Sequence, residues 1–218
     1  MATVVPAVIP ESSTHLVDTL RAISAWHDEV QVDIVDGLFV PHTSWPYVSG
    51  GTIDTLSAFT QDIAIEIDLM VQEPETVIED YVRAGVRRVV VHLETVKTLA
   101  RIVSLKQKYS FLLGFSIGND TPLEILHAVV GYADYVQLMG IASIGAQGQL
   151  FDTRVIDRIR AIRHAHAALP ISIDGSVNEA TIAALIDAGA DRLVSGSAIL
   201  RAEDPQRAYE TLAHLASA

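Results

Sequence analysis

The sequence predicts a (β/α)8 barrel in a single domain over residues 1–218. Short apolar runs alternate with helix-like segments along the chain, which is typical of parallel strands joined by right-handed crossovers. The length fits one barrel, since such domains have roughly 200–250 residues. Three of the runs also carry an acid at or near their carboxyl ends, the place where barrels bind their ligands.

Each expected strand is a short, mainly apolar run, and the runs cover 3–9, 29–35, 63–70, 87–92, 111–116, 133–139, 171–174 and 192–195. The expected helices show capping residues and apolar residues at helical spacing, and they cover 12–26, 53–59, 74–84, 95–106, 122–130, 152–166, 178–188 and the segment after Pro205. Eight even units favour a closed barrel. The alternative is an open doubly wound sheet, which lacks support because no Gly-x-Gly-x-x-Gly follows the first strand.

The run 29–35 places polar residues at alternate positions. Side chains of a strand alternate between its faces, so Gln31 and Asp33 share one face and the aliphatic residues between them form the other. Parallel strands are normally apolar on both faces, and a carboxylate beside an amide therefore indicates a polar site. A half-exposed antiparallel strand is the alternative.

The same pattern recurs in two later runs. Glu66, Asp68 and Met70 share one face of the third run, and Ser172 and Asp174 share one face of the seventh. Because the carboxyl ends of barrel strands meet at one face, we expect these acids to lie near one another and near the acid of the second run.

Composition excludes several classes of protein. The net charge of −12 disfavours a nucleic-acid partner, and the absence of cysteine removes disulfides and thiolate metal sites. With 50% hydrophobic and 19% charged residues and no long apolar run, we expect a globular protein without a membrane segment. No secretory signal is evident at the N-terminus, so a cytoplasmic location is expected.

Two groups of residues are candidates for chemistry. Asp33 and Asp174 lie toward the ends of the second and seventh strands and could serve as general base and general acid on opposite faces of one bound substrate, although solvated strand ends are the alternative. Glycines and serines after strands six to eight could bind a phosphate through backbone N–H groups, or could be plain turn residues: Gly145, Gly148, Gly175, Ser176, Gly196 and Ser197.

The residue inventory disfavours other barrel chemistries. The lysines lie on or just after the fourth helix, at Lys97, Lys106 and Lys108, so no strand end offers one for a Schiff base. His92 ends the fourth strand, where it either lines the pocket or satisfies a core hydrogen bond. Asp36 is expected to bond to its own turn.

Six motifs in order resemble the ribulose-phosphate 3-epimerase family, a barrel of the ribulose-phosphate-binding type that inverts C3 of ketose phosphates. They are VDIVDGLFVP at 32–41, DLM at 68–70, VHLE at 91–94, GAQGQ at 145–149, IDGS at 173–176 and SGS at 195–197. The resemblance covers nearly the whole chain. It implies an isomerase acting on a pentulose or hexulose phosphate, in a homo-oligomer. The alternative is a barrel that binds a sugar phosphate without turnover.

The resemblance also implies a metal site and a pocket lining. The family's ligands are usually two histidines and two aspartates, and the matching positions here are Gln31, Asp33, Asp68 and Asp174. This all-oxygen set suits Mg²⁺ or Mn²⁺ better than Zn²⁺, and a protein without metal is the alternative. Met70 and Met139 match the family's pocket lining. The strand-three lysine of related sugar-phosphate decarboxylases has no counterpart in DLMVQE at 68–73.

Overall fold

The computed structural model describes residues 2–48, 51–145 and 148–217. Its eight strands form a sheet that closes into a barrel in the order β1 to β8, which confirms the predicted fold class. The strands are β1 (Thr3–Val8), β2 (Glu29–Val35), β3 (Ala64–Met70), β4 (Arg88–His92), β5 (Leu112–Ile117), β6 (Tyr135–Met139), β7 (Ile171–Asp174) and β8 (Arg192–Ser195). The α-helices are α1 (Ser13–Ser24), α2 (Ile78–Arg83), α3 (Leu99–Tyr109), α4 (Leu123–Val129), α5 (Arg154–Ala165), α6 (Ile182–Ala188), α7 (Ser197–Leu200) and α8 (Pro205–Ser217), and the 3-10 helices are η1 (Ile53–Ala58), η2 (Pro74–Thr76) and η3 (Val130–Tyr132).

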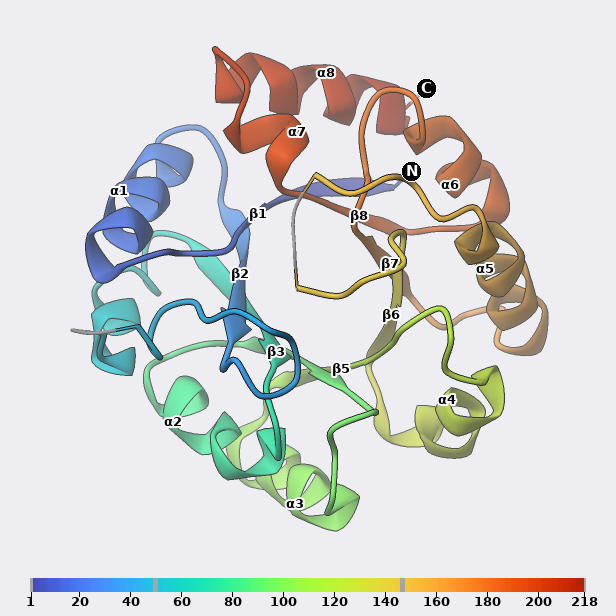
Figure 1. The fold of residues 1–218 in the computed structure, drawn as a ribbon, viewed down its shortest axis with the longest axis horizontal. Helices are drawn as coiled ribbons and strands as arrows, with labels where there is room; N and C mark the ends of the chain where they lie inside the picture. The colour runs from blue at the N-terminus through green and yellow to red at the C-terminus, as the bar shows by residue number, and fades with distance from the viewer. Residues whose placement is uncertain (1, 49–50, 146–147, 218) are drawn as a thin grey trace. The chain divides into compact units, whose positions relative to one another are not determined.

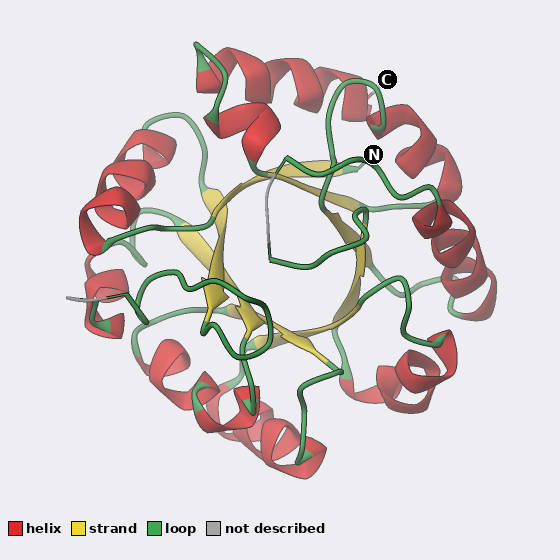
Figure 2. Ribbon diagram, in the orientation of Figure 1, coloured by secondary structure: helices red, strands yellow, loops and turns green. Residues whose placement is uncertain are grey.

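The chain divides into two compact units. The N-terminal unit is Val8–Gly114, in which β2, β3 and β4 pair in parallel and α1, α2 and α3 lie outside them (Figure 1). The C-terminal unit is Met1–Ala7 with Phe115–Ala218, in which β6, β7, β8 and β1 pair in parallel and α5, α6 and α8 lie outside them (Figure 2). The single domain expected over 1–218 stays a prediction.

The helices pack on the strands through apolar stripes. In α1 the buried residues are Leu16, Leu20 and Ile23, at the spacing of one helical face. The Ser12 hydroxyl accepts a hydrogen bond from the His15 N–H at 3.0 Å, so Ser12 caps the start of α1. None of the helices in the described ranges has both the length and the apolar character needed to cross a bilayer.

The segment 74–84 differs from the single helix that the sequence predicts. It forms η2 and then α2, after a left-handed Glu73 with a φ of 52°. The Glu75 side chain is turned into the protein, where its Oε1 accepts hydrogen bonds from the N–H groups of Lys97 at 3.1 Å and Thr98 at 2.8 Å. Glu75 thereby supports the start of α3. The break between η2 and α2 lets the Glu75 side chain point toward these N–H groups.

Removing this acceptor should destabilise the fold. In Glu75→Ala the two N–H groups lose a charged, 3% exposed partner, so we expect the free energy of unfolding to fall by about 1–3 kcal/mol. Urea denaturation measures the change. Glu75→Gln keeps an acceptor oxygen and is the control; an equal loss in both variants would contradict the capping role.

Candidate active site

Asp33 and Asp68 lie side by side in the N-terminal unit. They are Cα partners in the β2–β3 register and are only 4% and 0% exposed. Paired positions on neighbouring strands point to the same face, so the two carboxylates share one buried environment. Two buried anions repel each other, and such a pair is costly unless hydrogen-bond donors or a cation lie nearby.

Each of these carboxylates has a polar neighbour within the unit. The Gln31 Nε2 donates to Asp33 Oδ1 at 2.9 Å, and the His92 Nε2 lies 3.1 Å from Asp68 Oδ1. The sequence analysis named Gln31 as a candidate metal ligand, and that role stays a prediction. In the structure the amide nitrogen of Gln31 contacts Asp33, whereas a metal ion would need the amide oxygen. For His92 the structure shows the buried hydrogen bond, one of the two alternatives that the sequence left open.

Asp36 organises the loop after β2. Its Oδ1 accepts from the N–H groups of Leu38 and Phe39, and its Oδ2 accepts from the N–H of Gln72, beyond β3, at 2.8 Å. The expectation that Asp36 bonds to its own turn is confirmed. The further bond to Gln72 links the loops that follow the strands of Asp33 and Asp68.

In the C-terminal unit, β6 and β7 place polar residues opposite one another. Gln137 is the Cα partner of Ser172, and Met139 is the partner of Asp174. The Ser116 hydroxyl lies 3.6 Å from the Met139 sulfur. Gln137 and Ser116 are buried polar residues that our sequence analysis missed, although their alternation with apolar neighbours was the signal that revealed Asp33.

The glycine-rich loops of the C-terminal unit contact one another. The Gly140 N–H donates to the Asp174 carbonyl at 2.7 Å, and the Ser176 hydroxyl donates to the Gln149 carbonyl. A Cβ at Gly140 would lie 2.1 Å from the Gly175 carbonyl oxygen, so only glycine allows this approach. The loops after β6 and β7 are thus held together. Ala146 and Gln147 of the predicted motif lie outside the described residues.

The end of β8 is also joined to the loop after β7. The Ser195 hydroxyl donates to the Val177 carbonyl at 2.8 Å, directly before Gly196 and Ser197. Gly145, Gly148 and Gly175 have positive φ angles of 86°, 76° and 96°, which suits glycine. The predicted phosphate-binding residues therefore belong to three loops that hydrogen bonds connect.

We expect the stability of the fold to depend on pH through Asp152, in the loop after β6. Hydrogen bonds from Arg154 in the first place, assisted by Asn119, lower the pKa of Asp152 to about 2. A carboxyl group with a lowered pKa stabilises the fold above its unfolded pKa of about 3.9, and this stabilisation is lost as the pH falls through about 2. We expect the wild type to lose more stability between pH 4 and pH 2 than Asp152→Asn, measured by urea denaturation at each pH. Parallel curves would contradict this assignment.

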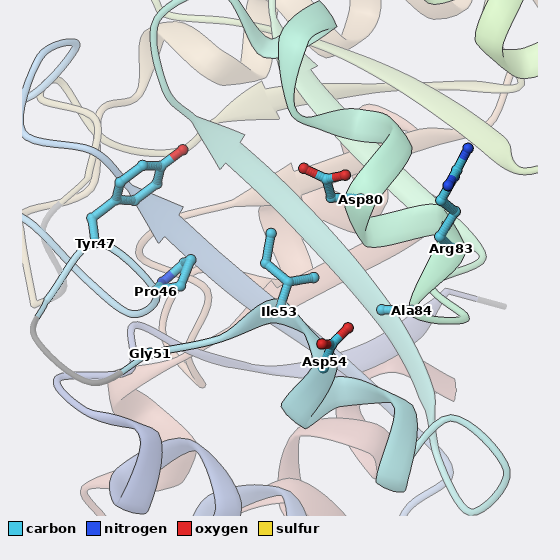
Figure 3. Close-up of a pocket in the computed structure, with 8 residues that line it drawn as sticks. All are labelled: Pro46, Tyr47, Gly51, Ile53, Asp54, Asp80, Arg83 and Ala84. Carbon is cyan, nitrogen blue, oxygen red and sulfur yellow. The ribbon is translucent and has the colours of Figure 1, made fainter.

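A separate pocket of about 500 Å³ lies in the N-terminal unit (Figure 3). It is lined by Pro46, Tyr47, Gly51, Ile53, Asp54, Asp80, Arg83 and Ala84. Burial, and then the negative charge of Asp36, raise the pKa of Tyr47. Arg83 bonds to Glu79 and Tyr109. None of the predicted site residues lines this pocket.

Comparison with known proteins decides the family. The model of the ribulose-phosphate 3 epimerase family matches residues 3–200. The chain belongs to this family. Ribulose-phosphate 3-epimerase of Chlamydia pneumoniae is 30% identical over 205 residues, which are 91% of this chain and 87% of that protein. The enzyme of Aquifex aeolicus is 32% identical over 183 residues, 81% and 79% of the two chains. The name of both relatives is that of an isomerase, so the expected enzyme class is confirmed at the level of the family.

Solved structures support the fold. A 3-hexulose-6-phosphate synthase aligns with a TM-score of 0.73 and 21% identity, over 97% of this chain and 98% of that one. The 3-keto-L-gulonate-6-phosphate decarboxylase of Vibrio cholerae aligns with a TM-score of 0.73 and 14% identity, over 99% of this chain and 97% of that one. At these identities the likeness concerns the barrel.

Proposed function

We propose that this member of the ribulose-phosphate 3 epimerase family inverts C3 of a pentulose or hexulose phosphate, using Asp33 and Asp174 as acid and base. The family match over residues 3–200 carries the proposal. Further support comes from the two acids themselves, which belong to β2 and β7 near or at the carboxyl ends of those strands, the usual position of barrel active sites.

The reaction needs one base and one acid on opposite faces of the sugar. One aspartate, ionised, removes the C3 proton, and the electrons of the C–H bond move into an enediolate with the neighbouring carbonyl. The other aspartate, protonated, gives its proton to C3 from the opposite face. The configuration is inverted, and the two aspartates have exchanged protonation states. No other co-reactant is required.

A divalent cation fits the acidic residues. Asp33 and Asp68 place two buried carboxylates on neighbouring strands of the N-terminal unit, and Asp174 at the end of β7 is the third acid of the proposed set. Carboxylate oxygens are the donors that Mg²⁺ and Mn²⁺ prefer, and Gln31 beside Asp33 offers an amide. We propose that these residues hold Mg²⁺ or Mn²⁺ in preference to Zn²⁺. When bound, such a cation would stabilise the negative charge of an enediolate.

We propose that the phosphate binds in the C-terminal unit at Gly145, Gly148, Gly175, Ser176, Gly196 and Ser197. Glycines let backbone N–H groups approach an anion closely. Met70 and Met139, each 2% exposed, would line the sugar site beside His92. Arg201, which directly follows α7, adds a cation that the sequence analysis missed: a Cβ at Gly148 would lie 3.7 Å from its Nη1.

Arg201 should contribute to phosphate affinity. We expect Arg201→Gln to raise the KM for the ketose phosphate about tenfold with little change in kcat, because a phosphate contact serves ground state and transition state alike. Steady-state kinetics measure both constants. Arg207→Gln on α8 is the control; equal KM values for wild type and Arg201→Gln would exclude Arg201 from the phosphate site.

One experiment tests the proposed function directly. The wild type is incubated in D₂O with a panel of pentulose and hexulose phosphates, and deuterium at C3 is followed by NMR. Exchange with inversion supports the proposal and identifies the substrate. Binding of a ketose phosphate without exchange would favour the alternative, a sugar-phosphate-binding barrel without turnover. The homo-oligomer and the cytoplasmic location expected from the sequence stay predictions.

A further inference from the structure

We propose that His92 is a positioning residue, which holds the Asp68 carboxylate in one orientation so that Asp68 can bind a divalent cation. This inference rests on the function proposed above. Both side chains are 0% exposed, and the His92 Nε2 lies 3.1 Å from Asp68 Oδ1. The two residues come from neighbouring strands, β4 and β3, within one unit.

The chemistry of the two groups sets the direction of this hydrogen bond. An ionised carboxylate only accepts, so the imidazole Nε2–H donates. With Nε2–H as the donor, the imidazole orients the carboxylate and leaves the other carboxylate oxygen available for a cation. A lysine or arginine at the same place would neutralise the carboxylate instead. Donors behind a metal ligand fix its orientation in this way, and their removal typically weakens metal binding.

The His92 ring is itself held in place. Its centroid lies 5.4 Å from that of Phe39, with the rings tilted by 50°. The His92 carbonyl accepts from the Thr95 N–H at 3.1 Å and from the Thr95 hydroxyl at 3.0 Å. A donor fixed by packing and by its backbone can orient Asp68 at little further cost in conformational entropy.

The same two strands provide a matched control. Glu66 is the Cα partner of Arg88, nearer the amino ends of β3 and β4, and Arg88 Nε donates to Glu66 Oε2 at 2.8 Å. Glu66 is 0% exposed, like Asp68. Here the guanidinium of Arg88 pairs with the buried carboxylate of Glu66, as is expected of a purely structural contact. Breaking this pair should destabilise the strands without affecting a cation at Asp68.

Mn²⁺ alone is the probe, titrated calorimetrically into the full chain. We expect His92→Leu, which keeps the volume and removes the donor, to raise the Kd for Mn²⁺ by about 10–100-fold. His92→Gln keeps an N–H group at similar reach and should stay within about fivefold of wild type. With the ketose phosphate, kcat should fall in His92→Leu while KM changes little. Glu66→Gln should lower the melting temperature and leave the Kd unchanged.

Two results would overturn the inference: a folded His92→Leu protein with the wild-type Kd for Mn²⁺, or an equal loss of Mn²⁺ affinity in Glu66→Gln. If His92→Leu does not fold, His92→Asn replaces it, since its shorter amide falls short of Asp68. A wild type that binds no Mn²⁺ also overturns the inference. A wild type that binds Mn²⁺ but turns over no ketose phosphate refutes the proposed function alone.

Discussion

In Asp33→Asn and in Asp174→Asn, the rate of inversion at C3 of a ketose phosphate is expected to fall by about 10²- to 10⁴-fold. Asparagine has nearly the shape of aspartate but neither takes up nor releases the proton. Epimerisation needs a proton transfer on each face of the sugar, so either substitution alone should block it. NMR of the substrate in D₂O measures both the inversion and the deuterium uptake.

The two variants should differ in which transfer survives. If one aspartate takes the C3 proton of a given epimer, its replacement stops exchange from that epimer, while loss of the partner stops inversion. Asp62→Asn, an exposed residue just before β3, is the control and should keep wild-type activity. Circular dichroism checks the folding of each variant. Uptake and inversion that persist in both folded variants would refute the two-aspartate mechanism.

Removing divalent cations is expected to produce the second large effect. A bound metal is worth several kcal/mol of charge stabilisation in a transition state, and each 1.4 kcal/mol or so corresponds to a factor of ten in rate, so dialysis against a chelator should slow turnover by several orders of magnitude. The melting temperature should also fall, because the neighbouring carboxylates of Asp33 and Asp68 then repel each other.

Metal analysis of the purified protein identifies the ion, and the melting curve is recorded before and after chelation. Adding back Mn²⁺ or Mg²⁺ should restore both stability and rate, and Zn²⁺ should do so less well. In Asp68→Asn the response to chelation should be smaller. The cation would be eliminated from the mechanism if the purified protein contained no metal and if neither the chelator nor the added ions changed its melting temperature or its activity.

The strands were the most predictable part of the fold. Alternation with period two and short apolar runs located all eight strands, and the observed ends differ from the predicted ones by at most two residues. The segment 74–84 was less predictable, because its irregular course depends on Glu75 reaching N–H groups at Lys97 and Thr98, more than 20 residues further on. Periodicity within a segment carries no information about such a contact.

The candidate site was also predictable only in part. Alternation placed Gln31 and Asp33 on one face, and their hydrogen bond follows directly from that spacing. The partner of Asp68 was not predictable, because the reach of His92 depends on the β3–β4 register and on the packing of Phe39. Arg201, which we propose for the phosphate site, was not predictable, because only the folded chain brings its guanidinium near Gly148.

The ion pair between the buried Glu66 and the half-buried Arg88 has a consequence for which parts of these strands can change. It neutralises charge near the amino ends of β3 and β4, whereas the acids toward the carboxyl ends of β2 and β3 are Asp33 and Asp68. Substitutions near the carboxyl ends can then change the side chains proposed to bind ligands, while the Glu66–Arg88 pair near the amino ends still stabilises the strands. Laboratory selection for new sugar phosphates should therefore find its tolerated changes near the carboxyl ends of β2 and β3.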